Sequence, residues 1–193
     1  EGYLPEAMVN YLMTLGWTPK GPEIQPWAQM EGDFTLEDVT HSPAFFDLKK
    51  LAAFNGEYIR ALSTEAFVDA CRPWLLAADA PFPADRFDEA KFAAMAPHIQ
   101  PRCVTLADAA GVVDFLFLAE PVVDEASWMK TFGAAEAPAI LVAARAAYEA
   151  LDGWTADALK SALESIGEVH GVKLGKAQAP VRVAVSGRTV GPP

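Results

Sequence analysis

The chain has 193 residues, and its 15 basic and 26 acidic side chains give a formal net charge of −11 at pH 7. Hydrophobic residues make up 52% of the chain, so there is enough apolar surface to offset the entropy of folding, and wholesale disorder is excluded. The longest apolar run, Ala137 to Ala144, is much shorter than the roughly 20 residues that cross a bilayer. We therefore expect one large or two small globular domains and no membrane partner.

The two cysteines, Cys71 and Cys103, do not form a CxxC pair and have no histidine cluster beside them in the sequence. This disfavours a disulfide framework and a structural zinc site, so we expect no metal and a cytoplasmic, reducing environment. The sequence begins at Glu1 without a methionine, a basic segment or an apolar signal segment. We expect it to be a piece of a longer protein.

Helical spacing begins close to the N-terminus. Met8, Leu12 and Leu15 recur at helical intervals and predict a first short helix. Three prolines between Thr18 and Gly32 predict a loop without regular helix, in which Trp27 anchors the segment by packing.

Capping signals predict the next two helices. Thr35, with Asp38 at the capping-box distance, predicts a short helix that ends at residues 41–43. Asp47 then provides an N-cap for a longer amphipathic helix through Tyr58.

The rest of the chain continues as helices. The predicted segments are 63–74, 85–96, 105–120, 137–151 and 155–170. Pro97 should end the second segment, and Thr105 with Asp108 should begin the third, which is apolar enough to be buried. Gly153 and Gly171 should cap the last two helices in the left-handed conformation. No run shows strand alternation, so the expected fold class is all-α (mainly).

Charge is distributed unevenly along the chain. Residues 169–193 contain no acidic residue, whereas the other residues carry 26 acidic side chains. The four basic residues of this tail are Lys173, Lys176, Arg182 and Arg188. The tail is either a small phosphate-facing patch or a solvated helix face, and the sequence pattern leaves both open.

The sequence lacks the short signatures of self-contained enzymes. It has no Walker loop, no GxGxxG after a strand, no HExxH and no GxSxG. His41, His98 and His170 are far apart in the sequence and lie near proline or glycine, which is typical of turns and helix ends. Catalysis by this chain alone is therefore not expected, and an enzyme would need a titratable cluster in a pocket.

Several strings along the chain resemble bacterial glutamyl-tRNA synthetase, in that family's order. They are EGYLPEA (1–7), NYL (10–12), LGW (15–17), SPAFFDLKKL (42–51), NGEYIR (55–60), PRCVTL (101–106), GVKLGK (171–176), PVR (180–182) and SG (186–187). The resemblance covers nearly the whole chain and is weakest over 77–96 and 125–149.

This resemblance implies the rear half of a class I aminoacyl-tRNA synthetase, which activates glutamate with ATP and attaches it to its tRNA. The sites for ATP and Mg would lie before Glu1, so the fragment would hold no cofactor and would not catalyse. Residues 1–64 would form a stem-contact region, and 65–120 and 121–193 two helical anticodon-binding subdomains, the last helix being truncated. The expected partner is glutamate tRNA and not DNA, and the expected state is a monomer.

The resemblance also assigns roles to residues. Arg102, in the PRCVTL string, falls on the family arginine that reads the third anticodon base and favours cytosine over guanine. Its alternative interpretation is a helix-flanking arginine in an ion pair. Arg182 falls on a family arginine near the middle anticodon base. Contacts to phosphates or to the tRNA stem are expected from Lys49, Lys50, Arg60, Lys173, Lys176 and Arg188.

Two departures from the family pattern and two alternatives remain. Cys103 stands where relatives can have an aromatic residue, and the sequence stops at Pro193, before the expected last helix. The alternative function is a helical protein–protein interaction module with no nucleic-acid role. A glutaminyl-type relative is disfavoured, because bacterial members of that branch end in β-barrels and this sequence has a helical pattern.

Overall fold

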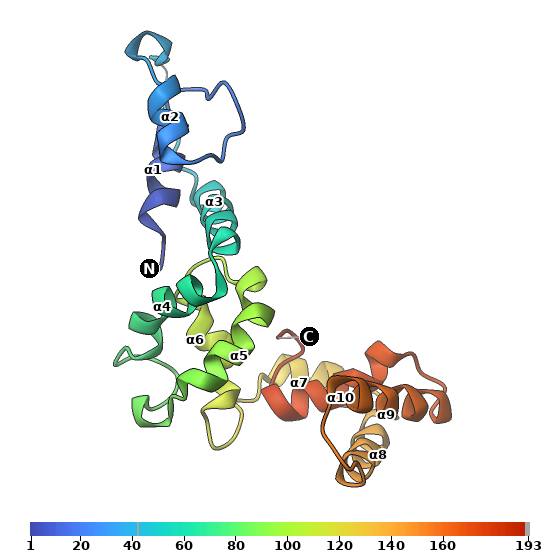
Figure 1. The fold of residues 1–193 in the computed structure, drawn as a ribbon. Helices are drawn as coiled ribbons and strands as arrows, with labels where there is room; N and C mark the ends of the chain where they lie inside the picture. The colour runs from blue at the N-terminus through green and yellow to red at the C-terminus, as the bar shows by residue number, and fades with distance from the viewer. Residues whose placement is uncertain (42, 192–193) are drawn as a thin grey trace. The chain divides into compact units, whose positions relative to one another are not determined.

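The computed structural model describes residues 1–41 and 43–191, and within them every regular element is helical (Figure 1). The α-helices are α1 (Pro5–Met13), α2 (Trp27–Asp33), α3 (Leu48–Ala61), α4 (Thr64–Leu75), α5 (Glu89–Ile99), α6 (Asp108–Val113), α7 (Glu125–Phe132), α8 (Ala137–Glu149), α9 (Ala156–Val169) and α10 (Leu174–Ser186). Short 3-10 helices are η1 (Leu36–Asp38), η2 (Ala84–Arg86), η3 (Gln100–Arg102) and η4 (Asp114–Leu116). The predicted all-α class is confirmed.

The chain divides into two compact units, residues 1–117 and 118–191. In the first unit, α1 packs on α3, and α4 packs on α5 and α6. In the second unit, α8, α9 and α10 pack on one another, and α7 lies against α8 and α10. Each unit therefore has an apolar interior of its own.

Aromatic side chains organise the interior of the first unit. The Tyr11 ring packs edge-on against Phe54, with 5.9 Å between the ring centroids. Trp17 is buried and packs edge-on against Phe34. The expectation that Trp27 anchors the segment 18–32 by packing is wrong, because 51% of Trp27 is exposed. Burial depends on the packing partners of each ring, which the local sequence does not specify.

Four of the local helix signals are confirmed. The Asp47 carboxylate accepts the Lys49 backbone N–H at 2.8 Å and so caps α3. The hydroxyls of Ser63 and Thr155 cap α4 and α9 in the same way. Gly171 follows α9 with a φ of +66°, which is the left-handed cap expected there.

Two predictions in the N-terminal region are wrong. The segment 18–32 is not free of helix, because α2 begins directly after Pro26 and buries Met30. A proline just before the first turn is compatible with a helix, since the first N–H groups have no partner within it. Thr35 caps nothing, and only one 3-10 turn, η1, follows it. The expected end of this helix includes Ser42, which lies outside the described residues.

Two helix boundaries in the middle of the chain also differ from prediction. Helix α5 continues through Pro97 to Ile99, because burying Ala96 and Ile99 outweighs one lost helical hydrogen bond. The next helix begins at Asp108, and the expected cap from Thr105 is wrong. The Asp108 carboxylate instead accepts the backbone N–H of Thr105. It ends at Val113 and passes into η4, so a continuous helix to residue 120 is wrong.

In the second unit the helix ends differ too. Helix α8 ends at Glu149 with Ala150 as its C-cap, and Gly153 does not have a positive φ, so its expected capping role is wrong. Apolar periodicity does not predict α7 or α10 as separate helices. Pro180 lies inside α10 and is buried there, so packing sustains a helix that the proline would oppose locally.

Candidate nucleic-acid interface

Arg102 lies at the end of η3, on the turn that connects α5 to α6. Its side chain is exposed, and its guanidinium has no hydrogen bond or ion pair with another described residue. The residue that follows, Cys103, is fully buried beneath the turn. The Asp108 carboxylate accepts the backbone N–H groups of Val104 and Thr105, at 2.9 and 2.7 Å. The guanidinium of Arg102 is therefore unpaired among the described residues, and its backbone is held by hydrogen bonds. No described carboxylate forms the ion pair of the alternative interpretation.

Arg182 lies on α10 in the second unit and is half-buried. Val183 beside it is fully buried, so the helix is firmly seated at this position. The Ser186 hydroxyl donates to the Arg182 carbonyl at 2.8 Å, but the guanidinium has no bond to a described residue. The donor groups of Arg182 are therefore available to a ligand.

Arg188 has a different environment from the other basic residues of the tail. Its Nε donates to the Ser186 carbonyl at 3.1 Å, just past the end of α10. Hydrogen bonds from Ser127 lower the pKa of the Asp124 carboxyl, and the charge of Arg188 lowers it further. Arg188 therefore helps to hold the segment that follows α10 within its own unit.

The basic residues of α3 are mostly paired. Lys50 Nζ is 2.7 Å from a Glu23 oxygen and lies over the Phe54 ring. Arg60 pairs with Glu57 at 2.7 Å along the same helix. Lys49 is exposed and has no ion pair within the described residues. A phosphate can share the two exposed pairs at low cost, because such pairs contribute little to stability.

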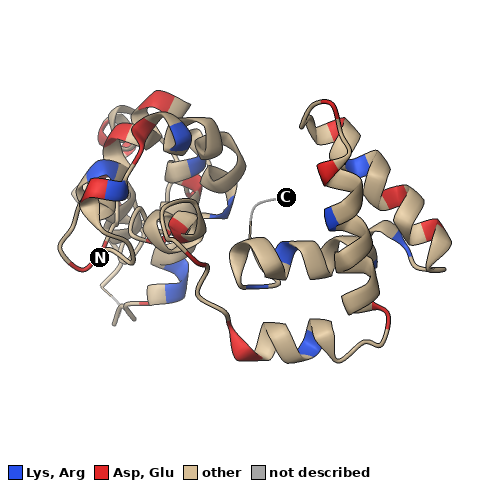
Figure 2. Cartoon of the chain, turned by 90° about the horizontal axis from the view of Figure 1, so that it is seen from below, with Lys and Arg blue, Asp and Glu red and all other residues tan. Residues whose placement is uncertain are grey.

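A hollow of about 330 Å³ in the second unit brings Lys176 of α10 together with Lys130 of α7. The side chains of Thr131 and Thr189 line it as well, and Glu136 contributes one carboxylate. Neither lysine has a carboxylate within 4.0 Å in the described part of the chain. Sequence reasoning missed Lys130, since it lies outside the basic tail, whereas Lys173 is exposed at the N-cap position of α10. Figure 2 shows basic residues interspersed with acidic ones, so any attraction for an anion is local.

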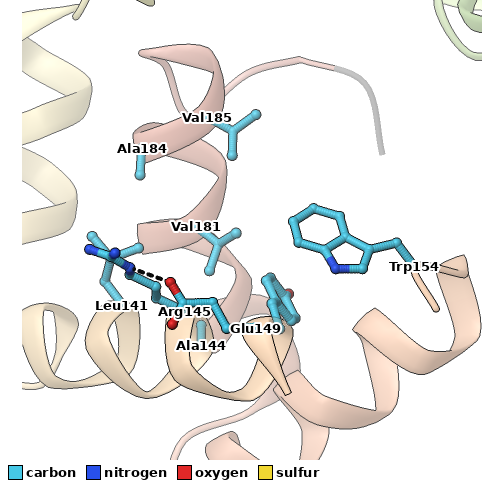
Figure 3. A pocket seen from close by; sticks show the side chains of 9 residues that line it. Leu141, Ala144, Arg145, Glu149, Trp154, Val181, Ala184 and Val185 are labelled. Carbon is cyan, nitrogen blue, oxygen red and sulfur yellow. Dashed lines mark hydrogen bonds and ion pairs between the residues drawn. The ribbon is translucent and has the colours of Figure 1, made fainter. Parts of the chain in front are cut away.

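A second hollow, also about 330 Å³, lies between α8 and α10 (Figure 3). Valines of α10 face the apolar side of α8, and Trp154 points towards them. Its charged lining consists of Arg145 and Glu149, which are joined at 2.8 Å. One paired carboxylate does not make a catalytic cluster.

The described residues do not fit the ATP and Mg of the expected parent enzyme. No group of three or more His, Cys, Asp or Glu side chains among them is arranged to hold a metal ion. No phosphate-binding glycine loop is present in the sequence either. No described helix is long and apolar enough to span a membrane.

A sequence model of the anticodon binding domain matches residues 66–193. The chain belongs to the anticodon binding domain family. It is 54% identical over its full length to the glutamate–tRNA ligase of Salinispora arenicola, of which it covers 42%. It is 55% identical to the enzyme of Thermobifida fusca and 50% identical to that of Streptomyces coelicolor, and covers 41% and 39% of them. The chain thus spans about two fifths of the length of these relatives.

Solved structures give the same family. The fold matches a glutamate tRNA ligase from Elizabethkingia meningosepticum with a TM-score of 0.77 and 27% identity, over 99% of this chain and 37% of that one. A second match, from Elizabethkingia anophelis, has a TM-score of 0.74 and 26% identity, over 99% of this chain and 36% of that one. The resemblance stated from the sequence strings is confirmed, and the chain corresponds to the C-terminal part of these ligases. The alternative of a protein–protein module gains no support.

Proposed function

We propose that the chain is the tRNA-recognition part of a glutamate–tRNA ligase and binds the inner corner and the anticodon loop of glutamate tRNA. The remainder of the parent enzyme would hold ATP and Mg and attach glutamate in the cytoplasm. The observation that carries the proposal is the exposed, unpaired guanidinium of Arg102, held on an anchored turn within a family string.

The chemistry of Arg102 suits a cytosine as the third anticodon base. The guanidinium has only donors, and an unpaired cytosine presents two acceptors, O2 and N3, on its pairing edge. The pairing edge of guanine presents donors at N1 and N2, which would face the donors of Arg102. Cytosine is therefore preferred over guanine both because it accepts hydrogen bonds from Arg102 and because the donors of guanine would repel those of Arg102.

The other basic residues supply the remaining contacts in this proposal. Arg182 approaches the middle anticodon base from α10, and phosphates lie near Lys173, Lys176 and Lys130. Residues 1–64 contact the stem through α3, whose basic residues are Lys49, Lys50 and Arg60. The regions 65–120 and 121–193 act as the two anticodon-binding subdomains. A phosphate contact by Arg188 remains a prediction beside its local bond to Ser186.

Fluorescence anisotropy at low salt tests this proposal. The chain is titrated against glutamate tRNA and against its variant with guanine as the third anticodon base. We expect cytosine to be preferred by at least about 1 kcal/mol, which is usual for one specific base contact, and Arg102→Ala to abolish the preference.

Arg86→Ala is the matched control, because Arg86 is an exposed arginine at the end of another 3-10 helix, η2, in the same unit. This control should keep the preference. Equal binding of the two tRNAs by the unmodified chain would refute the role of Arg102, and absence of binding to either would refute the proposal as a whole.

A further inference from the structure

We propose that Asn55 and Gln100 are positioning residues that orient the Arg102 turn by tying it to helix α3. Their side chains, here called the carboxamide clamp, hold the backbone on both sides of Arg102. The clamp deepens the proposed function and rests on it for the role of Arg102 in recognition. The geometry of the clamp itself is independent of any ligand.

Asn55 forms the first half of the carboxamide clamp. It lies in the middle of α3 and is fully buried. Its Nδ2 donates to the carbonyl of Val104, two residues after Arg102, at 2.6 Å. The same nitrogen lies 3.5 Å from the Gly2 carbonyl, and Oδ1 accepts the N–H of Leu4 at 2.7 Å. One side chain therefore joins α3, the N-terminal segment and the Arg102 turn.

Gln100 forms the second half, two residues before Arg102. It is 7% exposed, and its Nε2 donates to the carbonyls of Ile59 and Leu62 at 2.8 and 2.9 Å. These carbonyls lie at the end of α3, where the last carbonyls of a helix lack their usual partners. The Ile59 carbonyl also accepts the Leu62 N–H at 3.2 Å. The bond satisfies α3 and at the same time ties the start of the turn to it.

The N-terminal segment reinforces this arrangement. The Gly2 carbonyl accepts the N–H of Leu106 at 2.8 Å, so it runs along the segment that follows the turn. Gly2 has a φ of +83°, and a Cβ there would lie 2.6 Å from the Ala107 nitrogen. The close approach that brings Gly2 to Asn55 thus requires a glycine at this position.

The clamp connects helix α3, which lies outside the matched residues, to the Arg102 turn, which lies within them. Helix α3 precedes residues 66–193, yet its side chains and its terminal carbonyls set the backbone of the Arg102 turn. Hydrogen-bond readout of a base depends on direction, whereas attraction to phosphates does not. Loss of one carboxamide removes hydrogen bonds that tie the turn to α3 and so frees the turn. Base preference should therefore fall while phosphate-driven affinity remains.

Thiol labelling tests the clamp without any tRNA. Cys103 is fully buried directly beside Arg102. Cys71, also fully buried, lies on α4 near enough to Cys103 for their charges to interact, so its labelling reports whether the opening spreads beyond the turn. The chain is treated with excess maleimide, and the labelled peptides are quantified by mass spectrometry. We expect Asn55→Ala to accelerate labelling of Cys103 at least about 10-fold and to leave Cys71 unchanged.

The matched control is Asn10→Ala. Asn10 is likewise a fully buried carboxamide of the same unit. Its partners are the Glu23 carbonyl, the Gln25 N–H and the Tyr58 hydroxyl of α3, and none of them belongs to the Arg102 turn. It should leave the labelling of Cys103 unchanged. An unchanged rate in Asn55→Ala, or an equal acceleration by the control, would overturn the clamp. If Asn55→Ala does not fold, Gln100→Met tests the clamp by the same criteria. This substitution removes the hydrogen-bond donors of Gln100 and keeps the length of its side chain.

The binding assay then tests the role in recognition. Asn55→Ala and Gln100→Met should reduce the preference for cytosine over guanine at least about 3-fold, and should add nothing in the Arg102→Ala background. A retained preference in a variant with accelerated labelling would overturn this role. If the unmodified chain shows no preference, the proposed function of Arg102 fails, whereas the labelling result still decides whether the clamp holds the turn.

Discussion

Gly187 ends helix α10, and replacing it with alanine should strongly destabilise the second unit. Its φ is +74°, a conformation that costs an alanine about 1–2 kcal/mol. A Cβ there would lie 2.7 Å from the Val122 carbonyl carbon, which is backbone and cannot turn aside. Moving it would break the 2.9 Å bond from the Asp124 N–H to the Gly187 carbonyl, worth about 1 kcal/mol. Together with the displaced packing we expect a loss of at least about 3 kcal/mol.

Gly175→Ala in the same helix is the matched control. A Cβ at Gly175 meets no atom within 4 Å, so alanine should stabilise α10 by up to about 1 kcal/mol. The assay is amide hydrogen exchange read by mass spectrometry, with peptides of α8 reporting on the second unit and peptides of α4 on the first. Protection of α8 should fall in Gly187→Ala and rise slightly in Gly175→Ala. A loss below about 1 kcal/mol in Gly187→Ala would refute the reasoning from backbone overlap.

Three further predictions concern charge and buried groups. Lys130→Ala should reduce the slope of log affinity for tRNA against log salt concentration by about one. The control is Lys160→Ala, because Lys160 pairs with a glutamate on α9, and it should leave the slope unchanged. Equal slopes for Lys130→Ala and the unmodified chain would remove Lys130 from the interface. Burial raises the pKa of both Cys71 and Cys103 to about 12. The thiols of the unfolded chain therefore lose their protons at a lower pH than those of the folded chain, and the free energy of unfolding should fall as pH rises from about 9 towards 12. Urea midpoints across that range should fall less when both are replaced by alanine. Asp108→Ala should lower the free energy of unfolding by about 1–2 kcal/mol, measured by urea titration, while Asp108→Asn, which keeps one acceptor, should lose less.

The local sequence was sufficient for helix ends whose signals act within a few residues. Asp47, Ser63 and Thr155 each bond to an N–H two or three residues ahead, so the relevant information lies in one short string. Gly171 marks a helix end for the same reason, because its positive φ is a property of one residue.

The local sequence was insufficient where packing opposed it. Pro97 and Pro180 both lie inside helices, because burial of their neighbours outweighs one lost hydrogen bond. Trp17 and Trp27 are chemically alike, yet one is buried and the other half-exposed. Nothing within a few residues of either ring specifies its packing partners.

The candidate site shows the same division. Composition and spacing do not distinguish Arg102 from Arg86, and it was the ordered family strings that selected Arg102 and Arg182. The strings also included Asn55 but assigned it no role. They did not include Lys130, whose neighbour in the hollow, Lys176, is on another helix.

By itself, then, the sequence determined the all-helical class, the capped helix starts and the family, since these depend on local hydrogen bonds or on the order of residues along the chain. Only the tertiary structure decided what orients the candidate reader. Asn55 bonds to Leu4 and Val104, which are 51 and 49 residues away, and a fully buried carboxamide must find such partners. Which backbone groups it meets is settled only when the helices pack, because that is when distant segments come within hydrogen-bonding distance.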